Sequence, residues 1–512
     1  GARKSGIVFA AILISYAFSY SNSLLHSFLV PEMGLRGAKV KQFGLTVTPK
    51  LDGDWLGKGS CSILTKPRPV AILSPWENTS MAYRMTRLFS SLILSKRMQS
   101  TNRSLKAMSR RMGGKKAEVL YFHQPDDPYS HLTAQVLSEL QARYDIDLKI
   151  MLVDPPLDDV APERESLQEY GRRDAALIAP YHNLSFVDSG KQPSATSYQS
   201  ARRALAASSN LSKAAVEIGE AFWADDTDAL DRLAMVSEEK TEQVFRDGTK
   251  LRDSLSHYLG AMFYFEGEWY WGLDRLPYLE TRLKETGLRL SGCRQITKFQ
   301  DRPDFMSKPS NGKRLTVEFY PSARSPYTAI SMAETMDLPN HYPINLVVRP
   351  VLPMVMRDLP VPKRKGLYIV RDTKREADRI GVPFGKIADP VGEPVRRCYS
   401  LFSWAQEQNK GGELLHAFTD LAWAHGVDTG SDDGMRQVCE RAGLDWSGAQ
   451  AVIDNQDWQV WAEENRLQMM QSDLWGVPSF RLLDETGKEL YAGWGRDRIW
   501  LLVCEIQKAL EA

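Results

Sequence analysis

Residues 315–337 read LTVEFYPSARSPYTAISMAETMD, and residues 117–139 read AEVLYFHQPDDPYSHLTAQVLSE. Each stretch has a short apolar run, a polar turn, a Pro-Tyr pair and an amphipathic segment, which is typical of a strand that leads into a helix. A second pair of matching motifs follows in the same order, with WGLDRL at 271–276 and WGRDRI at 494–499. Two aligned anchors in one order indicate duplication of a whole domain.

The composition bounds the class of protein. The chain has 512 residues, of which 43% are hydrophobic and 25% charged, with a net charge of +1. That length suits about two to four domains, and the near-neutral balance gives no electrostatic reason to expect nucleic acid as a partner. The five cysteines are scattered and form no C-x-x-C pair. This argues against a metal ribbon, a disulfide scaffold and a dithiol redox centre, and it favours a reducing compartment.

Residues 1–112 are predicted to be a leader that is disordered, targets the protein or reflects a misassigned start. Gly6–Tyr20 follows two basic residues and suits a signal-peptide core or a short anchor, although it is shorter than the roughly 20 residues of a spanning helix. Residues 78–117 contain no Asp or Glu, as in an organellar transit peptide, with Met81 as a candidate start. We expect a cytoplasmic protein, with organellar import or N-terminal anchoring as alternatives, and no stable membrane association of the folded domains.

Both copies are predicted to begin as β-α-β, to continue through a helical insertion and to end as β-β-α. In the first copy, residues 113–300, we expect strands at 118–122 and 148–153, a helix at 131–144, a hairpin of 257–265 and 269–271, and a closing helix at 274–285. In the second copy, residues 312–512, we expect strands at 315–320 and 344–350, a helix at 327–336, a hairpin of 479–483 and 489–492, and a closing helix at 497–510. The predicted fold class is α/β, with two tandem thioredoxin-like domains.

The second copy carries short motifs in a fixed order. They are Val317–Tyr320 followed by Ser325-Pro326-Tyr327, Arg349-Pro350, Met356-Arg357-Asp358, Arg364–Tyr368, Asp372, Gly381-Val382-Pro383, Gly476-Val477-Pro478 and Gly495–Arg498. Through them it resembles the DsbA-like superfamily of thioredoxin folds, in the branch that contains 2-hydroxychromene-2-carboxylate isomerases and kappa-class glutathione transferases. The resemblance covers nearly all of residues 314–512 and implies glutathione as the cofactor. The first copy looks like a diverged relative.

Dithiol members of that superfamily carry Cys-Pro-x-Cys at the start of the first helix, where unpaired amides and the helix dipole stabilise a thiolate. Here the corresponding run is Ser325-Pro326-Tyr327-Thr328, and a serine hydroxyl cannot undergo thiol exchange. The resemblance implies that Ser325 is the catalytic residue and donates a hydrogen bond to the thiolate of bound glutathione. The plainer interpretation is an N-cap serine before a proline at the first helical position.

Gly476-Val477-Pro478 stands directly before a predicted strand, where thioredoxin-like folds place a cis-proline. That geometry would expose the backbone of Val477, which could then pair with an extended peptide such as glutathione. The resemblance implies a set of cofactor-binding residues, namely Val477, Pro478, Lys365, Arg496 and Asp497. Asp497 would hold the γ-glutamyl ammonium. The plainer interpretations are a turn proline, a solvated basic run around Lys365, and a first-turn acid that serves the helix dipole.

Three further residues are assigned to substrate binding: Arg324, Tyr327 and Arg357. Arg324 stands where relatives have an apolar residue, and Arg496 replaces a small one. The two extra cations could select an anionic substrate such as a carboxylate, or they could mean that the cofactor is not glutathione. No metal site is predicted.

The first copy departs from the pattern. Asp126-Asp127-Pro128-Tyr129 puts carboxylates where they would repel a thiolate, and Gly260-Ala261-Met262 has methionine where the cis-proline belongs. We expect a structural or regulatory half that packs against its partner, with Asp127 as a general acid or metal ligand in the alternative. His257 is expected to be a packed core residue, and Trp269-Tyr270-Trp271 to be core or interdomain surface.

These observations predict a glutathione-dependent isomerase or transferase that acts on a small aromatic or electrophilic substrate through its second copy. We expect either a homodimer or intramolecular pairing of the two copies. The alternative is a non-catalytic binding or scaffold protein made of two redox-inactive thioredoxin folds. A thiol-disulfide oxidoreductase is disfavoured because the paired cysteines are missing.

Overall fold

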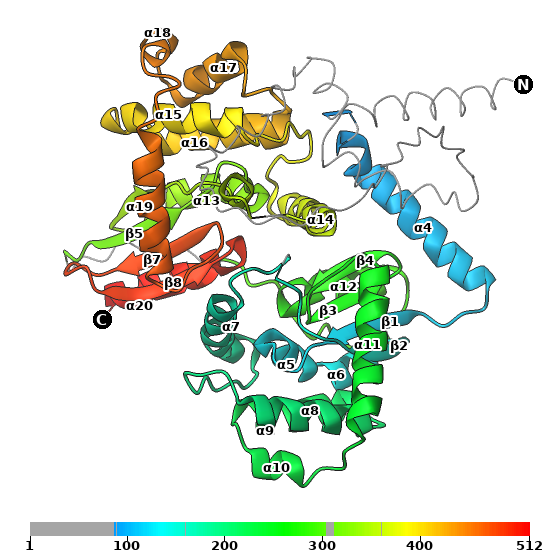
Figure 1. Cartoon of the computed structure of the whole chain (residues 1–512). Coiled ribbons are helices and arrows are strands. Elements are labelled where there is room, and N and C mark those ends of the chain that lie inside the picture. The colour runs from blue at the N-terminus through cyan, green and yellow to red at the C-terminus, as the bar shows by residue number, and fades with distance from the viewer. Residues whose placement is uncertain (1–86, 89, 159, 304–311, 360, 512) are drawn as a thin grey trace, which may run out of the picture. The chain divides into compact units, whose positions relative to one another are not determined.

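The computed structural model describes residues 87, 88, 90–158, 160–303, 312–359 and 361–511. The expectations for residues 1–86 lie outside these ranges. The first copy is built on a four-stranded sheet (Figure 1) of β1 (Glu118–His123), β2 (Asp147–Leu152), β3 (Met262–Phe265) and β4 (Glu268–Trp271). The strand order is β2-β1-β3-β4, with β1 and β2 parallel and the other pairs antiparallel.

The second copy repeats this sheet. Its strands are β5 (Leu315–Tyr320), β6 (Ile344–Val348), β7 (Ser479–Leu483) and β8 (Glu489–Trp494). They lie in the order β6-β5-β7-β8, again with one parallel pair and two antiparallel pairs. The same order of strands in both halves is the topology that duplication of a domain predicts.

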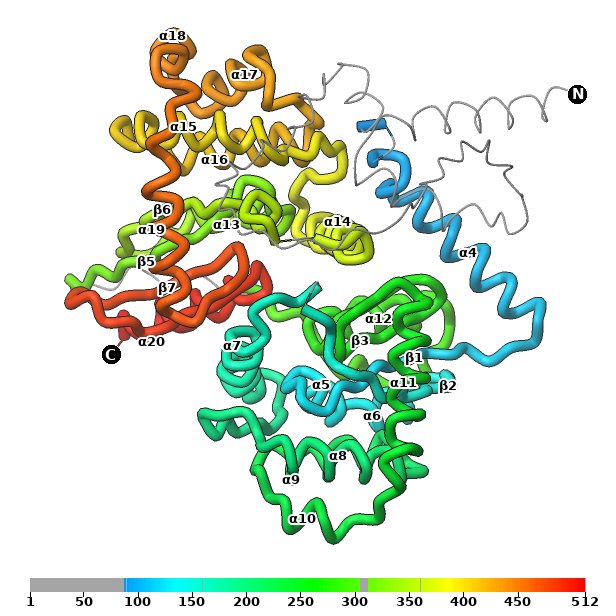
Figure 2. The backbone as a smooth tube through the Cα atoms, viewed as in Figure 1, coloured from blue at the N-terminus to red at the C-terminus, as the bar shows by residue number. Residues whose placement is uncertain are grey.

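In both copies, helices connect the second strand to the third and follow the last strand, as predicted (Figure 2). In the first copy they are α5 (Pro128–Ala134), α6 (Leu137–Arg143), α7 (Arg164–Ile178), η1 (Ala179–His182), α8 (Ala195–Ala207), α9 (Leu211–Trp223), α10 (Thr227–Asp231), α11 (Glu238–Ser254) and α12 (Gly272–Glu285). In the second copy they are α13 (Pro326–His341), η2 (Met354–Arg357), α14 (Lys363–Ile380), α15 (Glu393–Glu407), α16 (Gly411–Asp420), η3 (Leu421–His425), α17 (Asp432–Ala442), α18 (Trp446–Gln450), α19 (Trp458–Met470), η4 (Arg496–Arg498) and α20 (Ile499–Glu511). In the part of the chain described, no helix combines the length and apolarity needed to cross a membrane.

Buried aromatic side chains pack against one another across the two central strands of each sheet. Phe319 of β5 stacks on Phe480 of β7 with ring centroids 5.1 Å apart, and both are fully buried. In the first copy, Tyr121 of β1 lies 4.7 Å from Phe263 of β3. Burial of such large apolar surfaces is the main driving force for each half to fold.

Several predicted boundaries differ from the structure; for example, helix α13 ends at residue 341 rather than 336. The first hairpin strand begins at residue 262 rather than 257, because the preceding chain turns twice through the left-handed region, at Ser256 (φ 66°) and Ala261 (φ 52°). The helix predicted over 131–144 is divided into α5 and α6. Gln135 and Val136 donate back three residues rather than four, which tightens the chain and ends the first segment.

The last part of the predicted leader is helical, and the leader itself stays a prediction. Residues 96–112 form a helix, α4 (Lys96–Met112), which contacts the first copy at the turn between β3 and β4. Arg103 makes two hydrogen bonds to Glu268, at 2.7 and 2.8 Å, and Arg110 makes one to Glu266 at 2.9 Å. The basic composition that suggested a targeting peptide here serves in part to pair these carboxylates.

Candidate functional site

Ser325 begins helix α13. Its backbone is extended (φ −87°, ψ 120°), Pro326 follows at the first helical position, and the side-chain oxygen accepts a hydrogen bond from Thr328 N at 3.2 Å. Serine suits this place because its oxygen satisfies an amide that has no partner within the helix, and proline suits the next because that position needs no amide hydrogen. The plainer interpretation of Ser325 as an N-cap is therefore confirmed.

The same hydroxyl faces the loop before β7. The Val477–Pro478 peptide bond is cis, and Ser325 Oγ lies 3.5 Å from the carbonyl oxygen of Val477, to which it donates. Gly476 lies directly before this bond. A β-carbon at position 476 would come within 1.9 Å of the Trp494 indole, so any larger residue would force that ring to move. The serine and the cis-proline loop, 152 residues apart in sequence, are brought together as the sequence predicted.

Lys365 lies in the first turn of α14. Its ammonium donates to the carbonyl oxygen of Val160 at 2.8 Å and stands 5.7 Å from the centre of the Trp475 ring. Burial lowers the pKa of Lys365 to about 8. Val160 belongs to the first copy, so a group expected to bind a cofactor is already in contact with the other half of the molecule.

Asp497, like Lys365, forms hydrogen bonds to a residue of the first copy. Its carboxylate accepts hydrogen bonds from Nη1 and Nη2 of Arg275 at 2.8 and 3.0 Å. Burial works to raise the pKa of Asp497, but the Arg275 guanidinium outweighs it and holds this pKa below its ordinary value. The carboxylate predicted to hold an ammonium group therefore already binds a cation, and that cation comes from the first copy.

These contacts are half of a repeated network where the two copies meet. Arg275 of the first copy binds Asp372 on α14, at 2.9 and 3.0 Å, as well as Asp497. Arg498 of the second copy binds Asp174 on α7, at 2.7 Å through each of two nitrogens, as well as Asp274 at 3.1 Å.

Tyrosine hydroxyls complete both halves of the network. Tyr129 donates to Asp174, and Tyr327 donates to Asp372, each at 2.7 Å. Asp174, Asp372 and both arginines are buried. The arginine of each repeated Asp-Arg motif binds an aspartate on a helix of the other copy. Arg275 of the first copy binds Asp372 on α14, and Arg498 of the second copy binds Asp174 on α7. These hydrogen bonds join residues of the two copies within one chain.

The residues assigned to substrate binding are separated by this arrangement. Tyr327 is committed to Asp372 in the network, and the guanidinium of Arg324 makes two hydrogen bonds of 2.7 Å to Asp389. Arg357 lies half-buried in η2, where burial lowers its pKa. Their role in binding a substrate stays a prediction.

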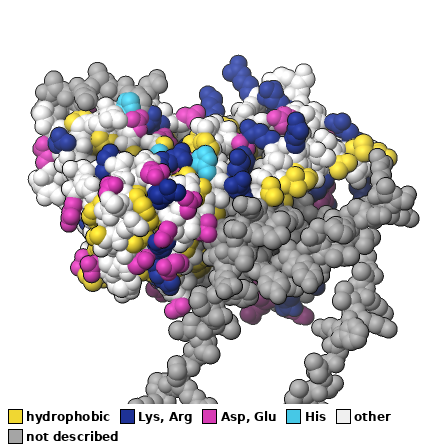
Figure 3. Space-filling view, turned by 90° about the horizontal axis from the view of Figure 1, so that it is seen from above, with side chains coloured by type: hydrophobic (Ala, Val, Ile, Leu, Met, Phe, Trp, Pro, Cys, Tyr) yellow, Lys and Arg dark blue, Asp and Glu magenta, His cyan; other side chains and the backbone are white. Residues whose placement is uncertain are grey.

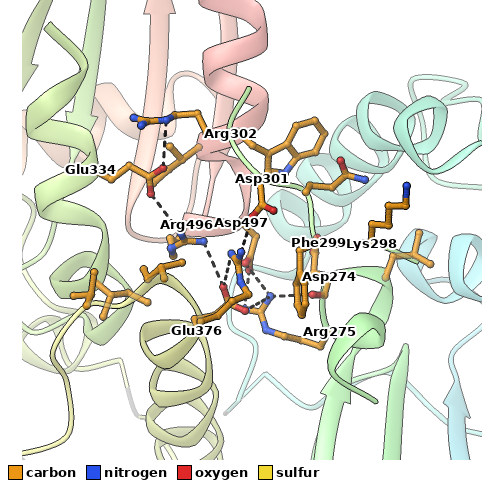
Figure 4. Close-up of a pocket in the computed structure, with 18 of the residues that line it drawn as sticks. Asp274, Arg275, Lys298, Phe299, Asp301, Arg302, Glu334, Glu376, Arg496 and Asp497 are labelled. Atoms are coloured by element: carbon orange, nitrogen blue, oxygen red, sulfur yellow. Dashed lines mark hydrogen bonds and ion pairs between the residues drawn. The ribbon is translucent and has the colours of Figure 1, made fainter. Parts of the chain in front are cut away.

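A pocket of about 690 Å³ opens beside the network (Figure 4). Arg496 and Asp497 line it, together with residues 298–302 and the outer side of α13. Arg496 bridges Glu334 and Glu376, at 3.4 Å each. Ser325, Lys365, Val477 and Pro478 are not among its lining residues. This pocket was not predicted from the sequence. Asp274, Arg275, Arg496 and Asp497 of its lining lie in the repeated Trp-Gly-x-Asp-Arg motif, whereas residues 298–302 belong to no motif.

The first copy has no equivalent of the serine and cis-proline pair. Asp127 caps α5, accepting hydrogen bonds from the amides of Tyr129 and Ser130 and from the Ser130 hydroxyl, and burial raises the pKa of Asp127 to about 7. Among the described residues the cis bond at Val477–Pro478 has no counterpart, so Ala261–Met262 is trans. His257 is fully buried and stacks on Tyr258, as predicted for a core residue.

Metal ligands do not gather in the described residues: no group of three or more His, Cys, Asp or Glu side chains could hold an ion there.

The second copy matches a known protein family. Residues 316–507 match the family model of the DSBA-like thioredoxin domain. No curated protein matches the chain.

Several solved structures are similar over about two fifths of the chain. They include a probable DsbA oxidoreductase from Streptomyces coelicolor, with 17% identity, a TM-score of 0.31 and coverage of 38% of this chain and 90% of that one. A 2-hydroxychromene-2-carboxylate isomerase has 20% identity and a TM-score of 0.32, with coverage of 38% and 95%. The cytosolic disulfide reductase DsbM from Pseudomonas aeruginosa has 15% identity and a TM-score of 0.28, with coverage of 38% and 99%.

Proposed function

Because residues 316–507 form a DSBA-like thioredoxin domain, we propose that this domain binds a thiol cofactor, glutathione, and uses it on a small aromatic or otherwise electrophilic substrate. The first copy is the structural half that holds the second in place. The resemblance of the motifs to 2-hydroxychromene-2-carboxylate isomerases and kappa-class glutathione transferases supports the choice of cofactor.

The observation that carries this proposal is the position of one hydroxyl. Ser325 Oγ stands at the N-terminus of α13 and within 3.5 Å of the carbonyl oxygen of Val477, beside the cis-proline. A hydroxyl can turn its proton from that carbonyl to a thiolate, and the positive end of the helix dipole stabilises the same negative charge. No thiol stands at Ser325, so the sulfur must come from a bound molecule.

The groups around Ser325 fit such a cofactor in part. The Val477 backbone would pair with the peptide, and the Lys365 ammonium would meet a carboxylate. When bound, glutathione supplies a thiolate nucleophile, and both isomerisation and transfer remain open to it. Ser325 would hold the sulfur as an anion, while the adjacent Arg324, neutralised by Asp389, would border the substrate.

The fit is poorer at Asp497, and this favours a second candidate function. Arg275 already occupies that carboxylate, and Val160 already accepts from Lys365. A domain whose binding groups are satisfied by its neighbour could serve as a non-catalytic scaffold. The two functions differ in whether the chain binds a free thiol.

A thermal-shift experiment separates them. Glutathione at about 100 times its dissociation constant should stabilise the folded state by roughly 2.7 kcal/mol. Ser325→Ala should abolish this shift, whereas Ser431→Ala, which removes an equivalent N-cap on α17, should leave it intact. No shift with wild type would favour the scaffold. Because the dithiol is missing, we expect no reduction of insulin above background.

A further inference from the structure

Helix α4 presents an apolar stripe on its outer side, away from the first copy. Leu105, Met108 and Met112 are 54%, 54% and 80% exposed. Their spacing of three and four residues puts them on one face of the helix. Single exposed apolar side chains are common, but a row of them along one helix marks a surface that contacts something apolar.

Positive charge borders this stripe. Carboxylates of the first copy reach α4 from its inner side, where Glu268 and Glu266 hold Arg103 and Arg110. Arg97 and Arg111 are exposed and lie fourteen residues, about four turns, apart, so both flank the same edge of the stripe. Arg111 also donates a hydrogen bond to the carbonyl oxygen of Thr286 at 3.1 Å. Because residues 78–117 contain no Asp or Glu, no acid within this segment offsets them.

The space-filling view agrees with this distribution. Figure 3 shows the molecule of Figure 1 from above, with the same left and right sides. Helix α4 lies on the right in Figure 1 and therefore on the right in Figure 3. On that side dark-blue and yellow side chains stand together, and magenta ones are few.

We propose that α4 docks on the surface of a membrane that contains anionic phospholipids. Leu105, Met108 and Met112 would enter the boundary of the acyl chains, and Arg97 and Arg111 would meet the phosphates. A helix with an apolar face and a basic border lies in this way at lipid interfaces. The interface offers an apolar layer beside negative charge at every point, so it needs no matching shape. The apolar stretch Gly6–Tyr20 in the same N-terminal region suits the same environment.

The docking helix lies outside the two copies, for which no stable membrane association was expected, and it is independent of thiol binding. Sedimentation of the full chain with vesicles tests it. Vesicles of phosphatidylcholine with about one third phosphatidylserine should bind the chain at least tenfold more tightly than phosphatidylcholine alone. The variant Arg97→Gln/Arg111→Gln should lose this preference.

The apolar stripe is tested separately. Leu105→Glu/Met108→Glu/Met112→Glu should weaken binding to acidic vesicles at least about tenfold. The matched control Leu157→Glu/Val187→Glu/Val460→Glu, which changes three exposed apolar residues elsewhere, should bind as wild type. Equal binding by the stripe variant and wild type would overturn the proposal, and so would a stripe-dependent dimer that ignores vesicles. Circular dichroism should show that both triple variants are folded, since all six side chains are exposed.

Discussion

At the scale of single residues, Ser325 has two roles that can be separated. As an N-cap it accepts from Thr328 N, and its hydroxyl also faces Val477. Ser325→Ala should cost about 1 kcal/mol in the free energy of unfolding, through loss of the cap. Ser431→Ala should cost a similar amount, because Ser431 accepts from Gly434 N at 3.0 Å. Urea unfolding of both variants measures this. A much larger loss at Ser325 would mean that its hydroxyl is mainly a packing element.

Lys365 predicts a pH dependence of stability. Burial lowers the pKa of Lys365 from 10.5 to about 8, so between these values the unfolded chain binds more protons than the folded one. Stability must then rise with pH through this window. At neutral pH the charged lysine costs at most about 3 kcal/mol.

The variant Lys365→Met does not titrate and isolates this effect. Its free energy of unfolding relative to wild type should be most favourable near neutral pH and should decline as pH rises through about 8 to 10. Denaturant unfolding at a series of pH values measures the difference. A difference that does not change across this range would show that the ammonium of Lys365 is well solvated.

At the scale of elements, the ion network fastens α14 and α7 to the opposite copy. Arg275→Met would leave Asp372 and Asp497 without their main cation in a buried place, which should cost about 3–5 kcal/mol. Arg466→Met is a matched control: it removes an arginine paired with the half-exposed Glu463 and should cost no more than about 1 kcal/mol. Urea unfolding compares them, and equal losses would contradict a structural role for the network.

Acid should distinguish the same variant from wild type. In wild type the pKa of Asp497 is held below its ordinary value, so its contribution to stability is present above that ordinary value and is lost as pH falls further. In Arg275→Met, Arg498 and Arg496 still lower the pKa of Asp497, but the largest opponent of burial is gone, so this pKa lies higher than in wild type. The destabilisation by Arg275→Met should therefore shrink as pH falls from neutral. Unfolding at successive pH values checks this, and a constant deficit would contradict it.

The elements also show what sequence could predict. The strand and turn of 315–337, the cis-proline and the duplicated strand order follow from local signals, because apolar runs, proline and caps act within a few residues. The role of the Asp-Arg motif in joining the copies did not follow. Its partners, Asp174 and Asp372, are 324 and 97 residues away from Arg498 and Arg275, and only the packed structure brings them together. The pocket beside them was missed for the same reason.

At the scale of the whole molecule, the two copies should behave as one assembly. A protease site inserted within residues 304–311 would cut the chain between them. Because the junction buries four arginine–carboxylate contacts, the two pieces should still elute together in size-exclusion chromatography. The double variant Arg275→Met/Arg498→Met should let them separate after cleavage. Separation of the wild-type pieces would show that the covalent link alone holds the halves together.

The proposed function depends most on Ser325 holding the sulfur of a bound thiol. The direct measurement is the ultraviolet absorbance of the thiolate as glutathione is titrated into the protein at neutral pH, with wild type and Ser325→Ala side by side. Wild type should show thiolate absorbance that saturates with glutathione, because the hydroxyl and the start of α13 lower the pKa of the bound thiol. Ser325→Ala should show little. Absence of the signal from wild type, or an equal signal from both proteins, would contradict this role of Ser325.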